Sequence, residues 1–320
     1  MSEPLHNSGS IDIKRIYELT VVMLTGGLLA WMAAEGLLQL AGWKMSGHAL
    51  FSVTGPFDNP GPYGGFLAIL LCICSSFSII HWREAGYKIA ARICAAISVL
   101  GAVALAATWS RTAWVGVLIA AIVLLLRERA NLSVMTKLTG RQVLLSVLVV
   151  LALAAGAFLM KKESALGRVH IWRMELRVIG EHPLKGVGRE YYLGEYGKTQ
   201  AKFFASMERP SAVKRVAGCP EYAFNEYLKF GMMYGVGGLI LSLVVAAGII
   251  GILLGRRSPL AYGAVTFAVF AAGSYPLSLW QFRALLWFFG VAAAVSLAVR
   301  KQSTGPHIIW SLRAFIRWCC

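Results

Sequence analysis

The feature that most constrains this chain is a series of long apolar runs, separated by short polar breaks. A helix that crosses a bilayer needs about 20 mostly apolar residues, and several runs approach or exceed that length. Only 14% of the residues are charged, against roughly 25% in ordinary soluble domains. The sequence therefore predicts an all-α, polytopic integral membrane protein with about eight transmembrane helices. The expected spans are 17–41, 64–82, 89–108, 112–126, 143–160, 233–255, 260–280 and 284–299.

Basic residues indicate which side each short loop faces, because Lys and Arg gather in cytoplasmic loops. With the N-terminus inside, the short outer segments contribute only Lys44, Arg111 and Arg283. The cytoplasmic segments then carry Lys14, Arg15, Arg83, Lys88, Arg92, Arg127, Arg129, Lys137, Arg141, Arg256, Arg257, Arg300, Lys301, Arg313 and Arg317. We therefore expect both termini in the cytoplasm and the long segment 161–230 on the outer face.

The chain divides into three parts on this pattern. Residues 1–160 hold about five N-terminal helices, 161–230 form a long periplasmic loop with an amphipathic helix, and 231–320 hold about three helices and a cytoplasmic tail. The long loop has thirteen Lys and Arg against eight Glu, and a basic outer surface attracts anionic substrates. A merely solvated loop is the alternative. The six cysteines show no metal-ligand spacing, so we expect no metal and no cofactor.

Two stretches on the outer side combine helix breakers with polar groups. Residues 54–70, TGPFDNPGPYGGFLAIL, allow tight turns before the second span, and Asp58 and Asn59 are expected to cap a turn. Residues 108–114, TWSRTAW, place Arg111 at the break between two apolar runs. A charge at that depth usually has a partner or a ligand, although its side chain can also reach the interface.

A third stretch, residues 164–188, reads SALGRVHIWRMELRVIGEHPLKGVG. Its apolar stripe recurs at helical spacing and comprises Val169, Trp172, Leu176 and Ile179. A second face carries His170, Arg173 and Arg177. Such a helix can lie on a membrane with its cations toward headgroups, and its guanidinium groups can pair with phosphate oxygens. For a single Arg, a solvated charge is the alternative.

The fourth stretch, FNEYLKFGMMYGVGG, begins at residue 224. We expect a helix from about Tyr222, which puts Glu221, Asn225 and Lys229 on one face and Glu226 one step around. Either glutamate can accept a proton from an incoming hydroxyl. The alternative is that Glu226 and Lys229 only form an ion pair at the membrane surface.

Taken in order, the pieces GPFDNPGPYGGFLA, SRTAWVG, GRVHIW with HPLKGVG, and FNEYLKFGMMYGVGG resemble the O-antigen ligase and polymerase family of bacterial inner-membrane glycosyltransferases. The resemblance covers about residues 50–240. It implies transfer of a glycan from undecaprenyl diphosphate to an acceptor hydroxyl on the periplasmic face, without a metal or a nucleotide sugar. The acceptor can be a glycan, the lipid A core or a protein, so the resemblance does not separate ligase from polymerase. Membrane lipids are the other expected partners, and no nucleic acid is expected.

The resemblance also implies roles for single residues. Outer-face arginines would hold the diphosphate, and the candidates are Arg111, Arg168, Arg173 and Arg189. The family pattern has His before Asn, then nine residues and Gly-x-x-Gly, whereas this chain has Phe224 before Asn225. A phenylalanine cannot accept a proton. The base must then be Glu226 or Glu221, or His170 or His182 from the same long loop; we favour Glu226, with Glu221 and Asn225 as the other catalytic candidates.

Two other classes of function stay open. A transporter of polyisoprenoid-linked glycan would also use a basic outer cavity, but transporters usually show internal repeats, and this sequence shows none. A non-catalytic assembly partner in polysaccharide export fits the missing His. It also fits an N-terminal part that is shorter than in family relatives.

Overall fold

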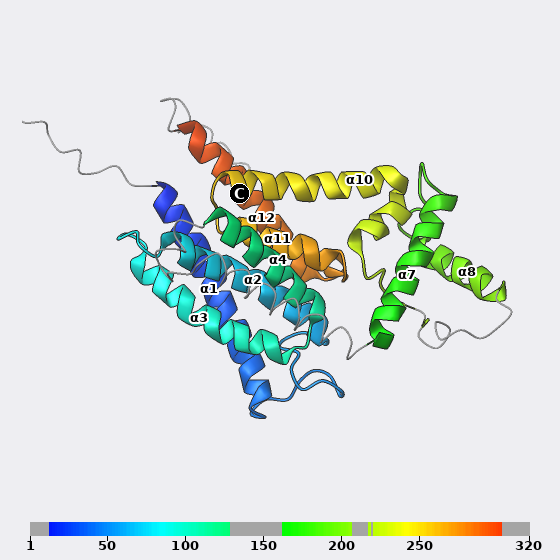
Figure 1. Ribbon diagram of the computed structural model, residues 1–320, viewed down its shortest axis with the longest axis horizontal. Helices are drawn as coiled ribbons and strands as arrows, with labels where there is room; N and C mark the ends of the chain where they lie inside the picture. The colour runs from blue at the N-terminus through cyan, green and yellow to red at the C-terminus, as the bar shows by residue number, and fades with distance from the viewer. Residues whose placement is uncertain (1–12, 129–161, 207–216, 219, 303–320) are drawn as a thin grey trace, which may run out of the picture.

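The structure is a computed structural model, and it describes residues 13–128, 162–206, 217–218 and 220–302 (Figure 1). Within those ranges the regular elements are helices, and β-pairing is limited to an isolated bridge between His48 and Phe51. The elements are α1 (Ile13–Leu40), α2 (Pro60–His81), α3 (Lys88–Ala107), α4 (Arg111–Arg127), α7 (Lys162–Glu181), α8 (Tyr192–Ala205), α10 (Glu226–Gly255), α11 (Leu260–Ala271), the 3₁₀ helix η1 (Pro276–Ser278) and α12 (Trp280–Gln302). The predicted all-helical class is thus confirmed for the described part.

Four of these helices, α1, α2, α3 and α10, are long and apolar enough to cross a membrane. α11 is a shorter apolar helix, and the apolar stretch of α12, Trp280–Val295, is also shorter than a typical span. The predicted span 260–280 is wrong in its end, because α11 stops at Ala271 and a turn with η1 follows. The predicted span 143–160 lies outside the described residues, so the count of eight and the three-part division stay predictions.

Helix α2 is the centre of the bundle. It packs against α1, α3, α4 and α11, and α10 lies along the outside of α11 (Figure 1). Its start follows from the sequence: the Asn59 side chain accepts a hydrogen bond from the Gly61 amide at 2.8 Å, and Pro60 occupies the first helical position. The expected cap at Asn59 is confirmed. Tyr63, fully buried one turn later, donates its hydroxyl to the Met32 carbonyl of α1 at 2.7 Å.

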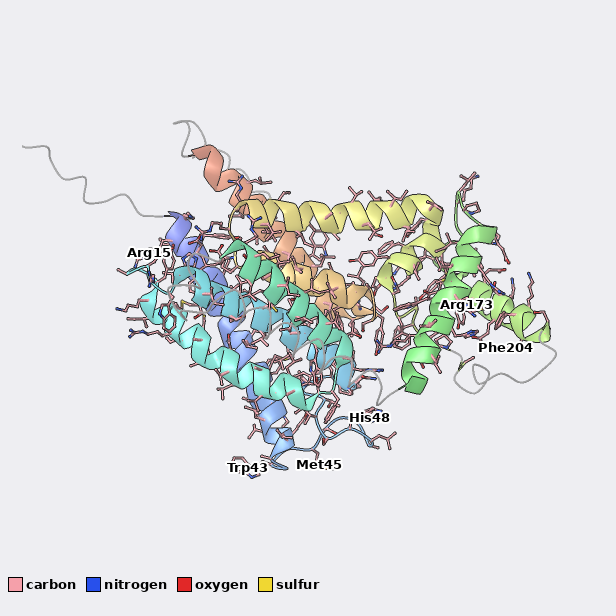
Figure 2. The ribbon with its side chains drawn as sticks, viewed as in Figure 1. Arg15, Trp43, Met45, His48, Arg173 and Phe204 are labelled. Carbon is pink, nitrogen blue, oxygen red and sulfur yellow. The ribbon has the colours of Figure 1, made fainter. Side chains whose placement is uncertain are left out.

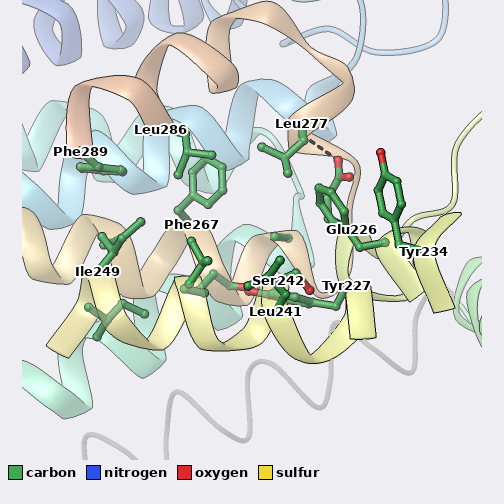
Figure 3. A pocket seen from close by; sticks show the side chains of 18 of the residues that line it. Glu226, Tyr227, Tyr234, Leu241, Ser242, Ile249, Phe267, Leu277, Leu286 and Phe289 are labelled. Carbon is green, nitrogen blue, oxygen red and sulfur yellow. Dashed lines mark hydrogen bonds between the residues drawn. The ribbon is translucent and has the colours of Figure 1, made fainter. Parts of the chain in front are cut away.

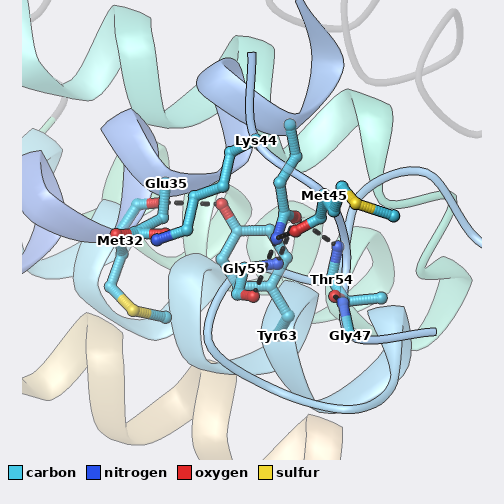
Figure 4. A network of polar contacts seen from close by, with 9 residues as sticks. Met32, Glu35, Lys44, Met45, Gly47, Thr54, Gly55 and Tyr63 are labelled. Atoms are coloured by element: carbon cyan, nitrogen blue, oxygen red, sulfur yellow. Dashed lines mark hydrogen bonds and ion pairs between the residues drawn. The ribbon is translucent and has the colours of Figure 1, made fainter. Parts of the chain in front are cut away.

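The loop between α1 and α2 is held by the side chain of Gln39 at the end of α1. Figure 4 labels Thr54 and Gly55, the loop residues that it binds. The Gln39 carbonyl oxygen accepts from the amides of Thr54 and Gly55, both at 2.8 Å, and its amide nitrogen donates to the Gly55 carbonyl at 3.0 Å. Because backbone groups buried without partners are costly, these bonds fix the path of the loop. At its tip Trp43 and Met45 are exposed (Figure 2).

Helices α7 and α8 form a unit at one end of the molecule, docked on the kinked start of α10 (Figure 1). α10 is interrupted at Gly235, where φ is 71°. The kink frees the carbonyls of Met232 and Met233, which accept from the amides of Val187 and Gly188 at 2.8 and 3.1 Å. In return, the Val236 amide donates to the Pro183 carbonyl at 2.8 Å. The segment 183–188 therefore completes the backbone hydrogen bonding of α10.

Candidate active site

Two of the four predicted diphosphate-binding arginines, Arg111 and Arg168, line one polar cavity of about 390 Å³. They come from segments far apart in the chain, since Arg111 begins α4 and Arg168 lies near the start of α7. The other walls are residues 50–53 of the α1–α2 loop, 59–61 at the start of α2, and 107–110 between α3 and α4. The cavity thus joins three of the four stretches that the sequence singled out.

Arg168 is held in place by hydrogen bonds on two sides. One guanidinium nitrogen donates to the Thr112 hydroxyl of α4 at 2.8 Å and to the Gly273 carbonyl beyond α11 at 2.7 Å. Burial, and to a lesser extent the positive charge of Arg111, lowers the pKa of the Arg168 guanidinium below its usual value. Two cations on the walls of one cavity repel each other, and an anion bound between them would relieve that repulsion.

Helix ends add to the positive potential of the cavity. The N-termini of α2 and α4 both contribute to its walls, through 59–61 and 110–112. The first amides of a helix have no intrahelical acceptor, and Ser110 does not cap α4 with its side chain. Amides and the helix dipole at such ends favour negative charge. The cavity is therefore suited to a phosphate-type group.

Phe224 lies directly against this site. Its ring centroid is 5.4 Å from the guanidinium carbon of Arg168, and Tyr275 meets the same ring edge-on at 5.2 Å. Tyr275 also stacks on Tyr222 with the centroids 4.0 Å apart. Phe224 has φ 52°, a conformation uncommon for a non-glycine residue. The position where the family pattern has His is therefore next to an arginine of the polar cavity.

Glu226 is buried, with 2% of its surface exposed, at the first position of α10. Its Oε1 accepts from the Leu277 amide at 2.7 Å (Figure 3). The Lys229 ammonium is 3.2 Å from Oε2 and also donates to the Ser278 hydroxyl at 3.0 Å. The expected Glu226–Lys229 pair exists, but Glu226 is buried and Lys229 half-buried, and both side chains also bind η1.

Glu226 also lines an apolar groove of about 570 Å³ between α10, α11 and α12 (Figure 3). Figure 3 shows aliphatic and aromatic side chains on both walls, among them Leu241, Ile249, Phe267 and Phe289. The groove extends from the Glu226 carboxylate along α10, and its lining is almost entirely apolar. It can hold a hydrocarbon chain with a polar group at the Glu226 end.

The other catalytic candidates are placed differently. The side-chain oxygen of Asn225 accepts from the Leu228 amide at 3.1 Å and so caps α10. Because the helix starts at Glu226, the expected helix from Tyr222 is wrong, and Glu221 does not share a helical face with Asn225. Glu221 is exposed in the preceding segment.

Arg173 and Arg189 are exposed, and neither lines the polar cavity (Figure 2 labels Arg173). His170 is buried with 3% of its surface exposed, beside Phe203 and Phe204 of α8, and its Nε2 is 3.2 Å from the Gln200 side chain. His182 is exposed after the end of α7. Of the alternatives to Glu226, neither histidine lines the apolar groove or the polar cavity.

Sequence reasoning missed Glu175, because the apolar stripe that it identified is not the buried face of α7. Of that stripe, Ile179 is buried, but Val169 and Leu176 are exposed, at 49% and 55%. The buried face includes Met174, Glu175 and Val178, each with 0% exposed. A glutamate inside a stretch rich in charged residues gives no signal of burial, so only the packing of α7 on α10 reveals it.

Glu181, His182 and Glu195 form a cluster at the end of α7 and the start of α8, with potential ligand atoms within 4.8 Å of one another. The Lys198 ammonium lies 2.9 Å from the Glu195 carboxylate, and its charge competes with any cation. The expectation that the protein needs no metal stays a prediction.

Among known families, the model described as O-antigen ligase matches residues 96–243. The matched range includes α4, α7 and the kinked first part of α10, and hence Arg111, Arg168 and Glu226. A search of curated proteins gives no match.

Proposed function

We propose that this membrane protein transfers a glycan from undecaprenyl diphosphate to an acceptor hydroxyl, because the family model described as O-antigen ligase matches residues 96–243, in agreement with the motifs. The observation that carries the donor assignment is the polar cavity that Arg111 and Arg168 line together with two helix N-termini. A diphosphate fits such a site, because guanidinium groups bind phosphate oxygens bidentately and helix ends attract anions.

The arginines then act on the leaving group. As the bond between the sugar and the diphosphate breaks, negative charge develops on the departing oxygen. Preorganised cations stabilise that charge more in the transition state than in the ground state. Thr112 and the Gly273 carbonyl hold the Arg168 guanidinium before the donor arrives, so little reorganisation is needed during the reaction.

The apolar groove supports a lipid-linked donor. We assign it to the polyprenyl chain, since its lining is apolar and it lies along α10, which is long and apolar enough to cross a membrane, beside the shorter apolar stretches of α11 and α12. Arg168 binds the Gly273 carbonyl, and Glu226 binds the Leu277 amide. The turn 272–279 thus joins the cavity for the diphosphate to the end of the groove.

Glu226 is the proposed base. The acceptor hydroxyl loses its proton to the Glu226 carboxylate while its oxygen forms the bond to the anomeric carbon of the sugar. The Lys229 ammonium and the Leu277 amide offset part of the cost of a negative charge on Glu226, and they orient its carboxylate for that step. Reaction at the periplasmic face of the bacterial inner membrane, with both termini in the cytoplasm, is part of the proposal.

A non-catalytic assembly partner is the second candidate, because Phe224 stands where the family pattern has His and cannot take a proton. Donor binding without turnover would favour it. The polar cavity would then serve to hold lipid-linked glycan for another enzyme.

The test is the surface polysaccharide of cells lacking the gene, separated on a gel after complementation with wild type, Arg111→Ala or Arg283→Ala. Arg283 is an exposed arginine on α12 that lines neither cavity. We expect wild type and Arg283→Ala to restore the pattern and Arg111→Ala to fail.

The pattern itself separates the reactions. Collapse of a ladder to single repeat units in the deletion identifies a polymerase, and loss of lipid A-linked glycan with accumulated carrier-linked polymer identifies a ligase. Full restoration by Arg111→Ala would contradict the assignment of the cavity.

A further inference from the structure

Glu175 is a carboxyl group in an environment that disfavours its charge. Its side chain is completely buried, on the face of α7 that packs against α10. Neither carboxyl oxygen has a hydrogen-bond partner among the described residues. The nearby cluster of Val178, Ile179, Ala223 and Met232 is apolar. An unpaired carboxylate there would be costly to desolvate, so the group favours its neutral, protonated form.

The second carboxyl of the region is Glu226. Burial, and then the negative charge of Glu226, raises the pKa of Glu175 to about 9. The Oε2 of Glu226 makes no hydrogen bond of acceptable geometry among the described residues, although the Lys229 ammonium lies 3.2 Å away. One carboxyl therefore favours a proton, and the other has an oxygen that can still accept a hydrogen bond.

Several described segments bring charged or titratable groups to this region. α10 contributes Glu226 and Lys229, the segment before it Tyr222, the segment after α7 Arg189, and α8 Tyr192. Of these groups, Lys229 and Arg189 are positive, and Lys229 pairs with Glu226 and donates to Ser278. Arg189 is exposed, and its positive charge favours the ionised form of the Tyr192 hydroxyl. The surroundings thus supply a direct counter-ion to Glu226 and leave Glu175 without one among the described residues.

We propose that Glu175 is a positioning residue for glycan transfer: neutral Glu175 and ionised Glu226 form a carboxyl pair that holds one proton, and this pair keeps Glu226 as the proton-accepting carboxylate. The inference rests on the proposed function. In the reaction the O–H bond of the acceptor breaks and its proton goes to Glu226, the acceptor oxygen bonds to the anomeric carbon, and the electron pair of the broken C–O bond leaves with the diphosphate. Glu175 keeps its proton, and Glu226 afterwards returns the new one to water.

The first test needs no substrate. Infrared spectra of the full chain in lipid nanodiscs, recorded against pH, follow the carbonyl band of protonated carboxylic acids. We expect a band that persists at pH 7 and disappears near pH 9, that is absent in Glu175→Gln, and that titrates at lower pH in Glu226→Gln because a like charge is gone. Glu190→Gln, which changes an exposed carboxyl of the same loop, should leave the band unchanged. A band that is missing at pH 7, or retained in Glu175→Gln, would contradict the proposal that Glu175 is protonated beside Glu226.

The second test measures transfer in membranes that contain carrier-linked glycan, as a function of pH. Glu175→Gln keeps a hydrogen-bond donor that cannot ionise, so it should retain transfer at pH 7 and lose the decline that we expect for wild type above pH 9. Glu175→Leu should lose transfer by at least about tenfold. Equal alkaline declines in wild type and Glu175→Gln, or full transfer by Glu175→Leu, would overturn the positioning role. The expected infrared band together with no transfer by wild type would instead overturn the proposed function, and with it the role of the pair in transfer.

Discussion

At the scale of single residues, position 224 shows how the site accommodates an aromatic ring. Phe224 contacts Arg168 and Tyr275, and its carbonyl accepts from the Trp172 indole at 3.3 Å. The ring therefore contributes to holding the arginine, through a cation–π contact of about 0.5–2 kcal/mol. Because a phenyl ring cannot take a proton, the proposed base is Glu226, which lies two residues further along the chain and is the buried carboxyl that lines the groove.

Replacement of Glu226 by Gln should abolish most transfer and leave the fold intact. A Gln oxygen can still accept from the Leu277 amide, so η1 stays attached, but the amide cannot take a proton at neutral pH. We expect a loss of at least about 100-fold in transfer rate, within the range for removal of a general base. Gel filtration and the melting temperature check the fold, and full transfer by this variant would exclude Glu226 as the base.

Glu175 should make stability depend on pH. Its folded pKa of about 9 lies above the ordinary value of 4.5, so between these values the folded state binds more protons than the unfolded state. Stability therefore falls as pH rises from 4.5 to 9, by about 1.4 kcal/mol per pH unit at most. Glu175→Gln removes this dependence. The melting temperature of the variant relative to wild type should rise from pH 5 to pH 8, and a constant difference would contradict the assignment.

The motifs predicted Arg111, Arg168 and Glu226 as candidates, and the structure places all three on the walls of cavities. What sequence could not supply was the choice among chemically equal residues. Arg173 and Arg189 have the same guanidinium group as Arg168, and only tertiary packing leaves them outside the polar cavity.

At the scale of elements, the kink of α10 accounts for the glycines on both sides of it. A Cβ at Gly235 would lie 2.4 Å from the Pro183 carbonyl oxygen, and one at Gly186 would lie 2.5 Å from the Met232 carbonyl oxygen. Both positions also have positive φ, at 71° and 65°, which glycine adopts without steric cost. The segments HPLKGVG and GVGG are distant in the sequence, but their backbones contact each other at the kink.

Gly235→Ala should therefore release the α7–α8 unit from α10. Positive φ and the clash with Pro183 act together, and we expect a loss of roughly 2–4 kcal/mol in local stability. Hydrogen exchange of residues 183–188 should become faster. Gly248→Ala is the matched control, since a Cβ there meets nothing within 4 Å and alanine favours helix. Unchanged exchange in Gly235→Ala would show that the kink does not depend on glycine.

Hydrophobic patterning predicted the existence of the long helices better than their ends. α1, α2, α3 and α10 correspond to expected spans, but α11 ends nine residues early, at Ala271 against the expected 280. The residues after it are still apolar, and they form a turn because Arg168 binds the Gly273 carbonyl and Glu226 binds the Leu277 amide. The hydrophobic pattern of the sequence does not predict such contacts between distant segments.

At the scale of the whole molecule, the turn 272–279 connects two cavities of opposite character, because it binds Arg168 of one and Glu226 of the other. One is polar and lined by arginines, and the other is an apolar groove. A lipid with a charged headgroup has the same division between its two ends. The fold therefore brings together, through one short turn, the two environments that a lipid diphosphate requires.

Filling the groove should block the lipid without altering the arginines. Ala246 lines the groove from α10, whereas its neighbour Ala247 is exposed and does not. Ala246→Trp is expected to reduce transfer at least about tenfold, because the indole occupies volume that the chain would fill. Ala247→Trp should retain transfer. Equal transfer activity of the two variants in the same membranes would contradict the assignment of the groove to the lipid chain of the donor.

The kink of α10 has a consequence for how the chain is made. The carbonyls of Met232 and Met233 depend on amides of the segment 183–188, and an unpaired carbonyl surrounded by hydrocarbon is costly. Ribosomes release residues 183–188 before α10, so this segment is available when α10 arrives at the bilayer. The α7–α8 unit would then fold first and complete the backbone hydrogen bonding of α10 as that helix inserts.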